Sequence, residues 1–508
     1  MSFRYFLNGP LRDAAVLGAV SARSVRVWAR VQIPGTVRAT CGLVGSEERR
    51  AEVFTEANDE NATDQTVVLV MGGLEPMQRY WFRVNRADSG ALVGEGTFET
   101  GPESTEESPR KFSIGLASCH QPFQKDGSVR ENAREMLRAT RRCFRENDTK
   151  MAFFVGDQMY TDFPTSMSLY DQKFFPNVAP PGRERVTDCS TDEVRRLLHE
   201  RYRHFWNLPE WIALQAEVPC YLTWDDHEII DNWGSSPEHQ EPLWASVGEG
   251  ARLACHDYQM SRVMSWQSDR GFQYPVDYGP VSTFMADMRS ERRGGENGRI
   301  FSDEQKADLV EFLKTRRDQA AIFLGLSVPP IHLPRKLTKS LSWLTPMGND
   351  FDDRWSTWAD ARDRDWLMRT LRDHQRENPK QHVVILSGDI HIGCAHAVVW
   401  EEDRGLRLHQ LISSGLTHKV NGFIAAASKF LIGANRVFET EKRDLSGQVE
   451  LVRGTDNARE NPVGKLNIGL VEIETRDDGG TDLQFKLFSQ KDGKPVLEFE
   501  SDRIRGEA

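Results

Sequence analysis

Several short apolar runs in this chain end in residues that carry chemistry, and this recurring pattern most constrains the fold. In residues 381–393, QHVVILSGDIHIG, the apolar run is followed at once by Asp389 and His391. An apolar run of this length is typical of a strand that is buried on both faces. Charged stretches with helical spacing, such as residues 128–147, separate the runs. Strands that alternate with helices predict an α/β core, in which chemistry gathers beyond the carboxyl ends of the strands.

The same ending follows three earlier apolar runs, at residues 112–117, 151–155 and 218–223. The polar residues behind them are, in chain order, Cys119 and His120, Asp157 and Tyr160, and Asp226 and His227. Each pair alone has an ordinary explanation, because an aspartate after a glycine is commonly a turn residue and a buried cysteine commonly packs as a small apolar side chain. Four such endings in one region favour a single shared site.

The residue types at these strand ends suit a centre with two metal ions. Carboxylates can bridge two cations, and imidazoles complete the coordination. Thiolate and tyrosinate ligands are anionic and favour a strongly Lewis-acidic ion such as Fe³⁺, whereas aspartate-rich positions suit a harder divalent ion. Two neighbouring cations lower the pKa of a shared water and hold an in-line displacement at phosphorus. The pattern therefore points to phosphate-ester chemistry.

The N-terminal residues 1–105 read as a small all-β unit. Residues 24–31 alternate polar and apolar side chains, as a half-buried strand does. The unit resembles a fibronectin type III or immunoglobulin-like sandwich, with Tyr80 placed as in a tyrosine corner. Residues 101–109, GPESTEESP, have the composition of a linker. We therefore expect a β-sandwich domain over 1–105.

A second domain is expected over residues 110–508, with a β extension over 465–503 at its C-terminal end. Residues 333–356 form an irregular segment that we expect to shape the mouth of the site, and residues 415–464 are expected to contain a lid or helix.

The overall charge and the cysteines limit the classes of partner and compartment. The net charge of −11 argues against a broad nucleic-acid or anionic membrane surface. The seven cysteines are odd in number and form no C-x-x-C pair, which indicates reduced thiols. No run reaches the roughly 18 apolar residues of a spanning helix, and no export signal is visible. We therefore expect a cytoplasmic protein; the sequence leaves its oligomeric state open.

Five motifs give the chain a specific resemblance. They are ASCHQP at 117–122, GDQMY at 156–160, WDDHEIIDNW at 224–233, DMRSERR at 287–293 and LSGDIH at 386–391. The motifs resemble those of the calcineurin-like metallophosphoesterases, and among them the alkaline phosphatase D family, which shares its GDxxY motif with the purple acid phosphatases. The resemblance covers nearly the whole chain. It implies an α/β fold with a metallophosphoesterase-type β-sandwich flanked by helices, preceded by the small all-β domain.

The resemblance also implies the metal ligands, which are Cys119, Asp157, Tyr160, Asp226, Asn232, Asp389 and His391. Asp157 corresponds to the carboxylate that bridges two ions, and Cys119 and Tyr160 correspond to ligands of a Fe³⁺ site. Asn232 has an equal alternative as a turn or helix-end cap. His120 follows the cysteine as a less certain ligand.

Two catalytic roles and one departure complete the expected site. His227 corresponds to the histidine that assists the leaving group. Arg289 could grip a phosphate oxygen, or it could form a structural ion pair. The superfamily offers a further histidine after an intermediate strand, whereas residues 321–330 contain none. The second metal site is therefore expected to be rich in oxygen ligands and to take Ca²⁺, or else Mg²⁺, Mn²⁺ or Zn²⁺.

The predicted function is metal-dependent hydrolysis of phosphate monoesters, diesters or both, by a hydroxide that bridges two metal ions. Two alternatives remain from the sequence. One is a non-catalytic binding protein that keeps the fold and docks through its β-sandwich. The other is a nuclease of the same superfamily, although the acidic net charge weighs against nucleic acid as a partner.

Overall fold

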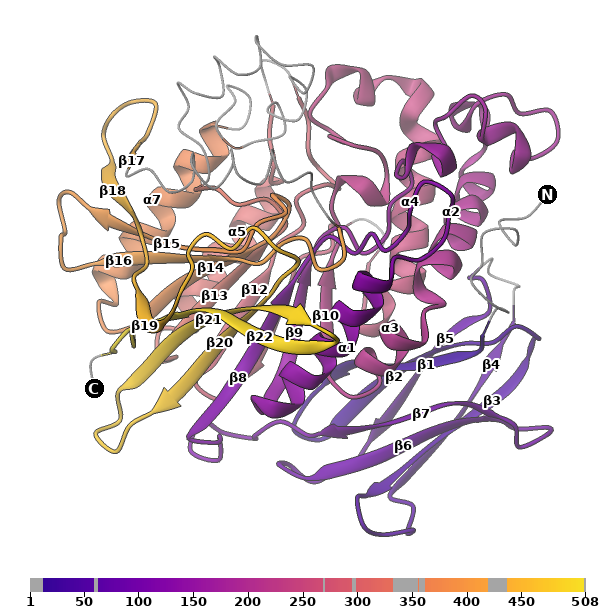
Figure 1. Cartoon of the computed structure of the whole chain (residues 1–508), viewed down its shortest axis with the longest axis horizontal. Helices are drawn as coiled ribbons and strands as arrows, with labels where there is room; N and C mark the ends of the chain where they lie inside the picture. Colours follow the sequence, from indigo (N-terminus) through magenta and orange to yellow (C-terminus); the bar gives the residue numbers. More distant parts are fainter. Residues whose placement is uncertain are drawn as a thin grey trace.

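The computed structural model describes residues 12–58, 63–267, 270–294, 298–331, 355, 361–418 and 436–506. Within these residues the chain forms four β-sheets (Figure 1). The expected mouth segment 333–356 lies outside the described residues apart from Trp355, and so do residues 419–435 of the expected lid segment.

The first two sheets form what we call the N-terminal β unit, strands β1–β7. Their strand orders are β1 (Ala14–Val20), β2 (Ser24–Arg30) and β5 (Thr66–Gly72), and β4 (Ala51–Ala57), β3 (Gly35–Leu43), β6 (Arg79–Arg86) and β7 (Leu92–Glu99). Both sheets contribute to one buried apolar cluster. The Tyr80 hydroxyl accepts a hydrogen bond from the Glu75 N–H at 3.0 Å, the contact expected of a tyrosine corner. The division of the chain at residues 101–109 stays a prediction.

A seven-stranded sheet carries the first three motif-bearing strands. Its order is β10 (Cys220–Thr223), β9 (Thr149–Val155), β8 (Lys111–Ala117), β20 (Ile468–Thr475), β21 (Thr481–Lys491), β22 (Lys494–Ser501) and β19 (Gly454–Arg459). Strands β8, β9 and β10 run parallel, so their carboxyl ends meet at one edge. The C-terminal strand β20 pairs with β8 and therefore lies inside this sheet.

An eight-stranded sheet carries the fourth motif. Its order is β11 (Tyr274–Tyr278), β12 (Val281–Met285), β13 (Ala321–Leu326), β14 (His382–Ser387), β16 (Arg407–Ile412), β15 (Cys394–Trp400), β18 (Ser446–Leu451) and β17 (Arg436–Glu439). In β14, Val384 and Leu386 join one buried cluster, while Val383 and Ile385 join another. The prediction of a strand buried on both faces is therefore confirmed.

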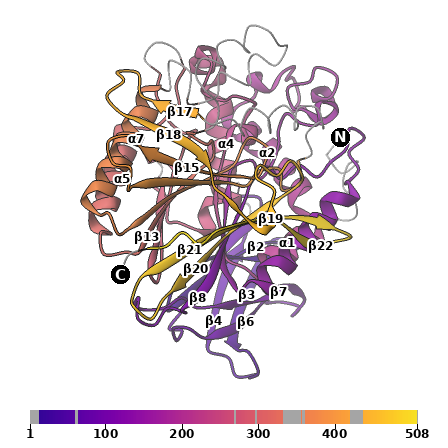
Figure 2. The same ribbon diagram turned by 60° about the vertical axis from the view of Figure 1, so that its left-hand side comes forward.

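Six α-helices pack on these sheets in the described part of the chain. They are α1 (Glu131–Glu146), α2 (Thr191–Trp206), α3 (Pro209–Gln215), α4 (Ala245–Tyr258), α5 (Asp303–Thr315) and α7 (Ala361–Glu377). Helices α5 and α7 cover the outer face of the eight-stranded sheet, whereas α2 and α4 lie at the opposite side of the molecule (Figures 1 and 2). Helices α2 and α3 are separate, because Pro209 cannot continue α2 and begins α3 instead.

All seven cysteines are buried, and each is present as a thiol, in agreement with the predicted reduced state. In the described parts of the chain, no helix combines the length and the apolar character needed to cross a membrane.

Two glycines let the ends of the two large sheets approach closely. A Cβ on Gly156, whose φ is +90°, would lie 2.7 Å from the Asp225 Cβ and 3.0 Å from the Ser327 Cβ. A Cβ on Gly388 would lie 2.5 Å from the Ser118 Cβ and 2.8 Å from the Val155 carbonyl oxygen. These are the glycines of the GDQMY and LSGDIH motifs, so each motif contributes a close contact as well as a carboxylate.

Gly388→Ala should lower the free energy of unfolding by about 1–3 kcal/mol, because the added methyl group meets a packed backbone. Urea denaturation followed by circular dichroism measures the loss. Gly405→Ala is the matched control, since a Cβ there has nothing within 4 Å, and we expect a change within about 0.5 kcal/mol. Equal unfolding midpoints for the two variants would contradict the close packing.

Candidate metal centre

Backbone hydrogen bonds join the turns that follow the strands of both sheets. The Cys119 N–H donates to the Gly156 carbonyl at 3.3 Å, and the Gly156 N–H donates to the Thr223 carbonyl at 2.9 Å. In the other sheet the Gly388 N–H donates to the Ser327 carbonyl at 3.1 Å. The four strand ends that carry the motifs therefore form one surface.

Five of the seven predicted ligands have a left-handed backbone. Their φ angles are +61° for Cys119, +56° for Asp157, +61° for Asn232, +64° for Asp389 and +56° for His391. A non-glycine residue in this region costs of order 1–3 kcal/mol and persists where surrounding structure enforces it, most often at functional sites. The backbone conformation of these turns therefore sets the direction of the predicted ligand side chains.

Cys119, Asp157 and Tyr160 form the most buried part of the site. The Cys119 Sγ lies 3.3 Å from Asp157 Oδ2, and the Tyr160 hydroxyl donates to the same oxygen at 2.9 Å. Two further residues touch this group: Ser414 Oγ lies 3.2 Å from the Cys119 Sγ, and His418 Nδ1 lies 3.1 Å from the Tyr160 Oη. Two predicted Fe³⁺ ligands therefore converge on the carboxylate predicted to bridge.

The charge balance of this group favours a cation. Burial and the nearby Asp157 carboxylate hold the pKa of the Cys119 thiol and of the Tyr160 phenol well above their usual values. Burial and the neighbouring carboxylates likewise raise the pKa of Asp157 well above its usual value. Asp157 Oδ1 is buried and has no hydrogen-bond partner among the described residues. A bound cation would satisfy this oxygen and stabilise the anionic forms.

Asp226 and His227 lie next to Asp157. One ligand atom from each of these three residues lies within 4.8 Å of the other two, a spacing that can hold a metal ion. Both side chains come from the short helix η5 (Asp226–Glu228) that follows β10. The His227 Nδ1 pairs with the Asp162 carboxylate at 2.9 Å. Burial opposes a charge on His227, but Asp162, Asp226 and Asp157 outweigh it and raise the pKa of the imidazole well above its usual value.

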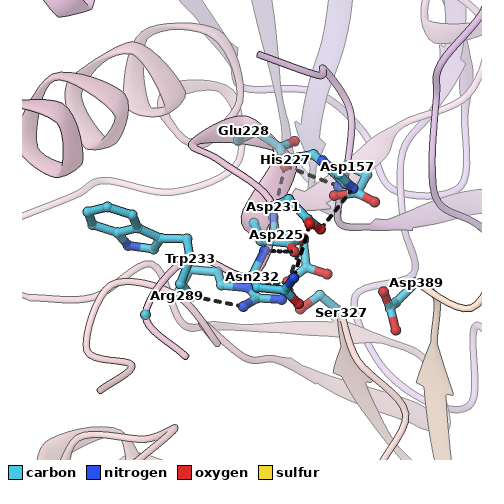
Figure 3. A network of polar contacts seen from close by, with 12 residues as sticks. Asp157, Asp225, His227, Glu228, Asp231, Asn232, Trp233, Arg289, Ser327 and Asp389 are labelled. Carbon is cyan, nitrogen blue, oxygen red and sulfur yellow. Dashed lines mark hydrogen bonds and ion pairs between the residues drawn. The ribbon is translucent and has the colours of Figure 1, made fainter. Parts of the chain in front are cut away.

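Arg289 is fully buried and faces carboxylates. Its Nε donates to Asp225 Oδ1 at 2.5 Å, its Nη2 lies 3.5 Å from Asp226 Oδ1, and its Nη1 donates to the Trp233 carbonyl at 3.0 Å (Figure 3). The exposed fraction of its side chain is 0%. This geometry favours the ion pair that the sequence left as the alternative to a phosphate grip.

Asn232 belongs to the same hydrogen-bond network as Arg289 and Asp226. Its backbone N–H donates to Asp226 Oδ2 at 2.6 Å, and its side-chain amide donates to Asp231 Oδ2 at 3.0 Å. The Asn232 amide oxygen stays a predicted ligand, while the backbone contact already fixes the Asp226 carboxylate.

Asp389 and His391 reach the site from β14. In Figure 3, Asp389 lies on the opposite side of the network from Trp233. The His391 N–H donates to the Ser414 Oγ at 2.8 Å, and the His391 ring lies 4.1 Å from the His418 ring. His391 is therefore tied to the residues that touch Cys119 and Tyr160, and the Asp389 carbonyl oxygen lies 3.8 Å from the Cys119 Sγ.

Glu228 holds two of these turns together. Its Oε2 accepts from the Asp157 and Asp225 N–H groups at 3.1 and 2.9 Å. Its Oε1 accepts from the Gln158 N–H at 2.6 Å and from the Gln259 side chain at 2.9 Å. Burial raises the pKa of this carboxyl to about 8. One side chain thus fixes the backbone on which Asp157 and Asp226 depend.

Sequence reasoning missed five side chains of the site, namely Asp162, Asp225, Glu228, Ser414 and His418. The last two follow strand β16, whose sequence RLHQLI contains three polar residues, so the pattern of an apolar run ending in ligand types did not mark them. His120, by contrast, turns away from the site: its ring stacks on Trp211 at 4.3 Å, and burial lowers its pKa to about 3.

The fold and the site together define a sheet-rich α/β protein with a cluster of side chains at its strand ends that could hold a metal ion. The family model described as PhoD-like phosphatase matches residues 114–456, and the chain belongs to this family.

Similar proteins agree with this assignment. The solved structure of PhoD has a TM-score of 0.67 and 14% sequence identity, and the alignment covers 97% of this chain and 92% of that one. Alkaline phosphatase D of Bacillus subtilis is 23% identical over 344 residues, which are 64% of this chain and 52% of that protein. An uncharacterized protein of Saccharomyces cerevisiae is 22% identical over 346 residues, 52% and 47% of the two chains. The chain thus spans about half the length of these curated relatives.

Glu228→Gln should lower the free energy of unfolding by about 2–6 kcal/mol. The amide has one acceptor oxygen, so two of the four buried donors lose their partner at about 1–3 kcal/mol each. Urea denaturation measures the change, and Glu238→Gln is the control because its side chain is 64% exposed. A Glu228→Gln protein as stable as this control would show that the carboxylate does not hold the turns.

Proposed function

We propose that the chain hydrolyses phosphate monoesters, diesters or both at a dinuclear metal centre. The observation that carries the proposal is the environment of Asp157. Its Oδ2 contacts both the Cys119 Sγ and the Tyr160 hydroxyl. Its Oδ1 is buried without a hydrogen-bond partner among the described residues. Asp226 and His227 lie beside it. Membership of the PhoD-like phosphatase family supports phosphoester hydrolysis as the reaction class.

The predicted metal ligands fall into two chemical groups. Cys119 and Tyr160, with Asp157, would hold Fe³⁺, because thiolate and phenolate are anionic ligands for a strong Lewis acid. Asp226, Asn232, Asp389 and His391, sharing Asp157, would hold Ca²⁺ or another divalent ion. When bound, the two ions would lower the pKa of a water molecule and neutralise the charge that develops on the phosphate.

The chain's own residues supply a proton and fixed geometry. His227 is held at Nδ1 by Asp162, and its raised pKa keeps a proton available for the oxygen of the leaving group. Arg289 pairs with Asp225 and Asp226 and so orients the carboxylate of a predicted ligand. We assign Arg289 this positioning role in place of a direct grip on phosphate.

Asp157→Asn should reduce turnover of p-nitrophenyl phosphate and of bis(p-nitrophenyl) phosphate by at least about 100-fold, because even outer partners of metal ligands are worth about 10–100-fold. Circular dichroism checks that the fold is kept. Asp373→Asn, on the surface of α7 and 60% exposed, is the control and should keep full turnover.

Turnover that matches the control in the Asp157→Asn variant would contradict the assignment. Failure of the metal-loaded wild-type protein on both substrates would favour the non-catalytic binding protein. Cleavage of DNA that weakens as salt rises would favour the nuclease.

The purified protein should contain iron and show a visible absorption band from tyrosinate to Fe³⁺, which Tyr160→Phe removes. Elemental analysis and absorption spectroscopy measure both. Tyr278→Phe is the control, since that ring packs against Phe112 at 5.1 Å. A colourless protein that holds only zinc or calcium would remove Cys119 and Tyr160 from the metal site.

A further inference from the structure

Helix α2 lies between the N-terminal β unit and the turn that carries Asp157. Trp206, at the end of α2, is buried, and its ring lies edge-on 6.0 Å from the ring of Trp28 in β2. Its Nε1–H donates to the Gln158 carbonyl at 3.2 Å. Gln158 directly follows Asp157. A single side chain therefore separates the N-terminal β unit from the backbone of a predicted bridging ligand.

A second residue of α2 holds the same turn. Arg201 is fully buried, and its Nε donates to the Tyr160 carbonyl at 2.6 Å while its Nη2 donates to the Phe163 carbonyl at 3.0 Å. Burial lowers the pKa of this guanidinium to about 9, which still leaves it charged at neutral pH. Together with Trp206, Arg201 fixes three carbonyl groups of the turn, and charged donors of this kind bind more strongly than neutral ones.

The opposite side of α2 is held by a carboxylate from the N-terminal β unit. Asp64 Oδ2 lies 3.1 Å from the Arg203 Nε of α2 and accepts from the Arg30 Nε of β2 at 2.8 Å. The Tyr258 hydroxyl of α4 donates to the same oxygen. The Asp64 side chain is only 10% exposed. Burial opposes its charge, but Arg30 and Arg203 outweigh it and lower the pKa of the carboxyl. A largely buried charge pair is costly to break from one side.

Further contacts join the same elements. The Trp28 Nε1–H donates to the Asp257 carbonyl of α4 at 2.8 Å. The fully buried Arg262 donates to the Leu17 carbonyl of β1. Val16 and Trp28 belong to the same buried cluster as the large sheets. The N-terminal β unit is therefore continuous with the core that supports the site.

We propose that the N-terminal β unit is part of the positioning apparatus of the metal centre. Through Asp64 and Trp28 it holds α2, and α2 holds the Gln158, Tyr160 and Phe163 carbonyls through Arg201 and Trp206. Asp64 and Trp206 are positioning residues, since their contacts are with protein groups. The inference rests on the proposed function, because it gives a role to the turn that carries Asp157.

The test uses the full-length, metal-free chain with Asp64→Asn, which removes the charge and touches no predicted ligand. Glu95→Gln is the matched control: it also removes one carboxylate of the N-terminal β unit, but its partner Arg83 is 49% exposed. Hydrogen–deuterium exchange of peptides covering 156–163 reports opening of the turn. We expect about tenfold faster exchange in Asp64→Asn, because the turn opens more readily when α2 is held less firmly, and wild-type exchange in Glu95→Gln.

Trp206→Phe provides a second, independent variant, because phenylalanine keeps an aromatic ring against Trp28 but cannot donate to the Gln158 carbonyl. It should also accelerate exchange over 156–163. If Asp64 acts through α2, the double variant should exchange more slowly than the product of the two single effects predicts, since coupled contacts are not additive. The proposal would be overturned if Asp64→Asn exchanged no faster than Glu95→Gln. It would also be overturned if the effects of the two single variants multiplied in the double variant. Should Asp64→Asn not fold, Trp206→Phe with wild-type exchange over 156–163 would overturn it alone.

The exchange measurement separates this inference from the proposed function. Suppose that Asp64→Asn exchanges fast but the wild-type protein hydrolyses no phosphate ester. The positioning role of the N-terminal β unit would then be supported and the proposed phosphatase function contradicted. Wild-type exchange in Asp64→Asn, together with strong phosphatase activity of the wild-type protein, would contradict the positioning role and support the proposed function. In iron-loaded protein, a weaker tyrosinate band in Asp64→Asn than in Glu95→Gln would add support, because the band depends on the placement of Tyr160.

Discussion

The buried negative charge around Asp157 is the interaction on which the site depends. Asp157, Asp225, Asp226 and Glu228 are each at most 4% exposed and lie at the ends of two neighbouring strands. Burying carboxylates together is unfavourable unless each is compensated. Glu228 accepts four hydrogen bonds, and Arg289 faces both Asp225 and Asp226. Asp157 Oδ1 is buried without a hydrogen-bond partner among the described residues, so the surrounding structure leaves a place for positive charge beside it.

The fold brings these residues together through parallel strands and close backbone contact. Strands β8, β9 and β10 end at the same edge of one sheet, and β13 and β14 end at the facing edge of the other. Gly156 and Gly388 allow the two edges to touch. The turns that carry the predicted ligands therefore lie where the two sheets meet, and neither sheet alone would provide the complete set.

Local patterns were enough to predict the four strands that lead into the motifs. An apolar run followed by Gly-Asp is visible within ten residues, so Asp157 and Asp389 could be found from the sequence alone. Contacts that depend on distant backbone groups could not. Glu228 matters because of N–H groups on another turn, and His418 arrives after β16, whose pairing with β14 is not encoded nearby. Arg289 was ambiguous because a guanidinium suits a phosphate and a carboxylate equally well.

The position of β20 has a consequence for the order in which the protein is made. Strand β8, which leads into Cys119, pairs with β9 on one side and with β20 on the other. During synthesis the first partner emerges soon after β8, whereas residues 468–475 emerge only after the strands of the eight-stranded sheet. Until then one edge of β8 lacks its native partner, and such edges are prone to wrong pairing. The proposed metal centre is therefore expected to mature only after residues 468–475 have left the ribosome.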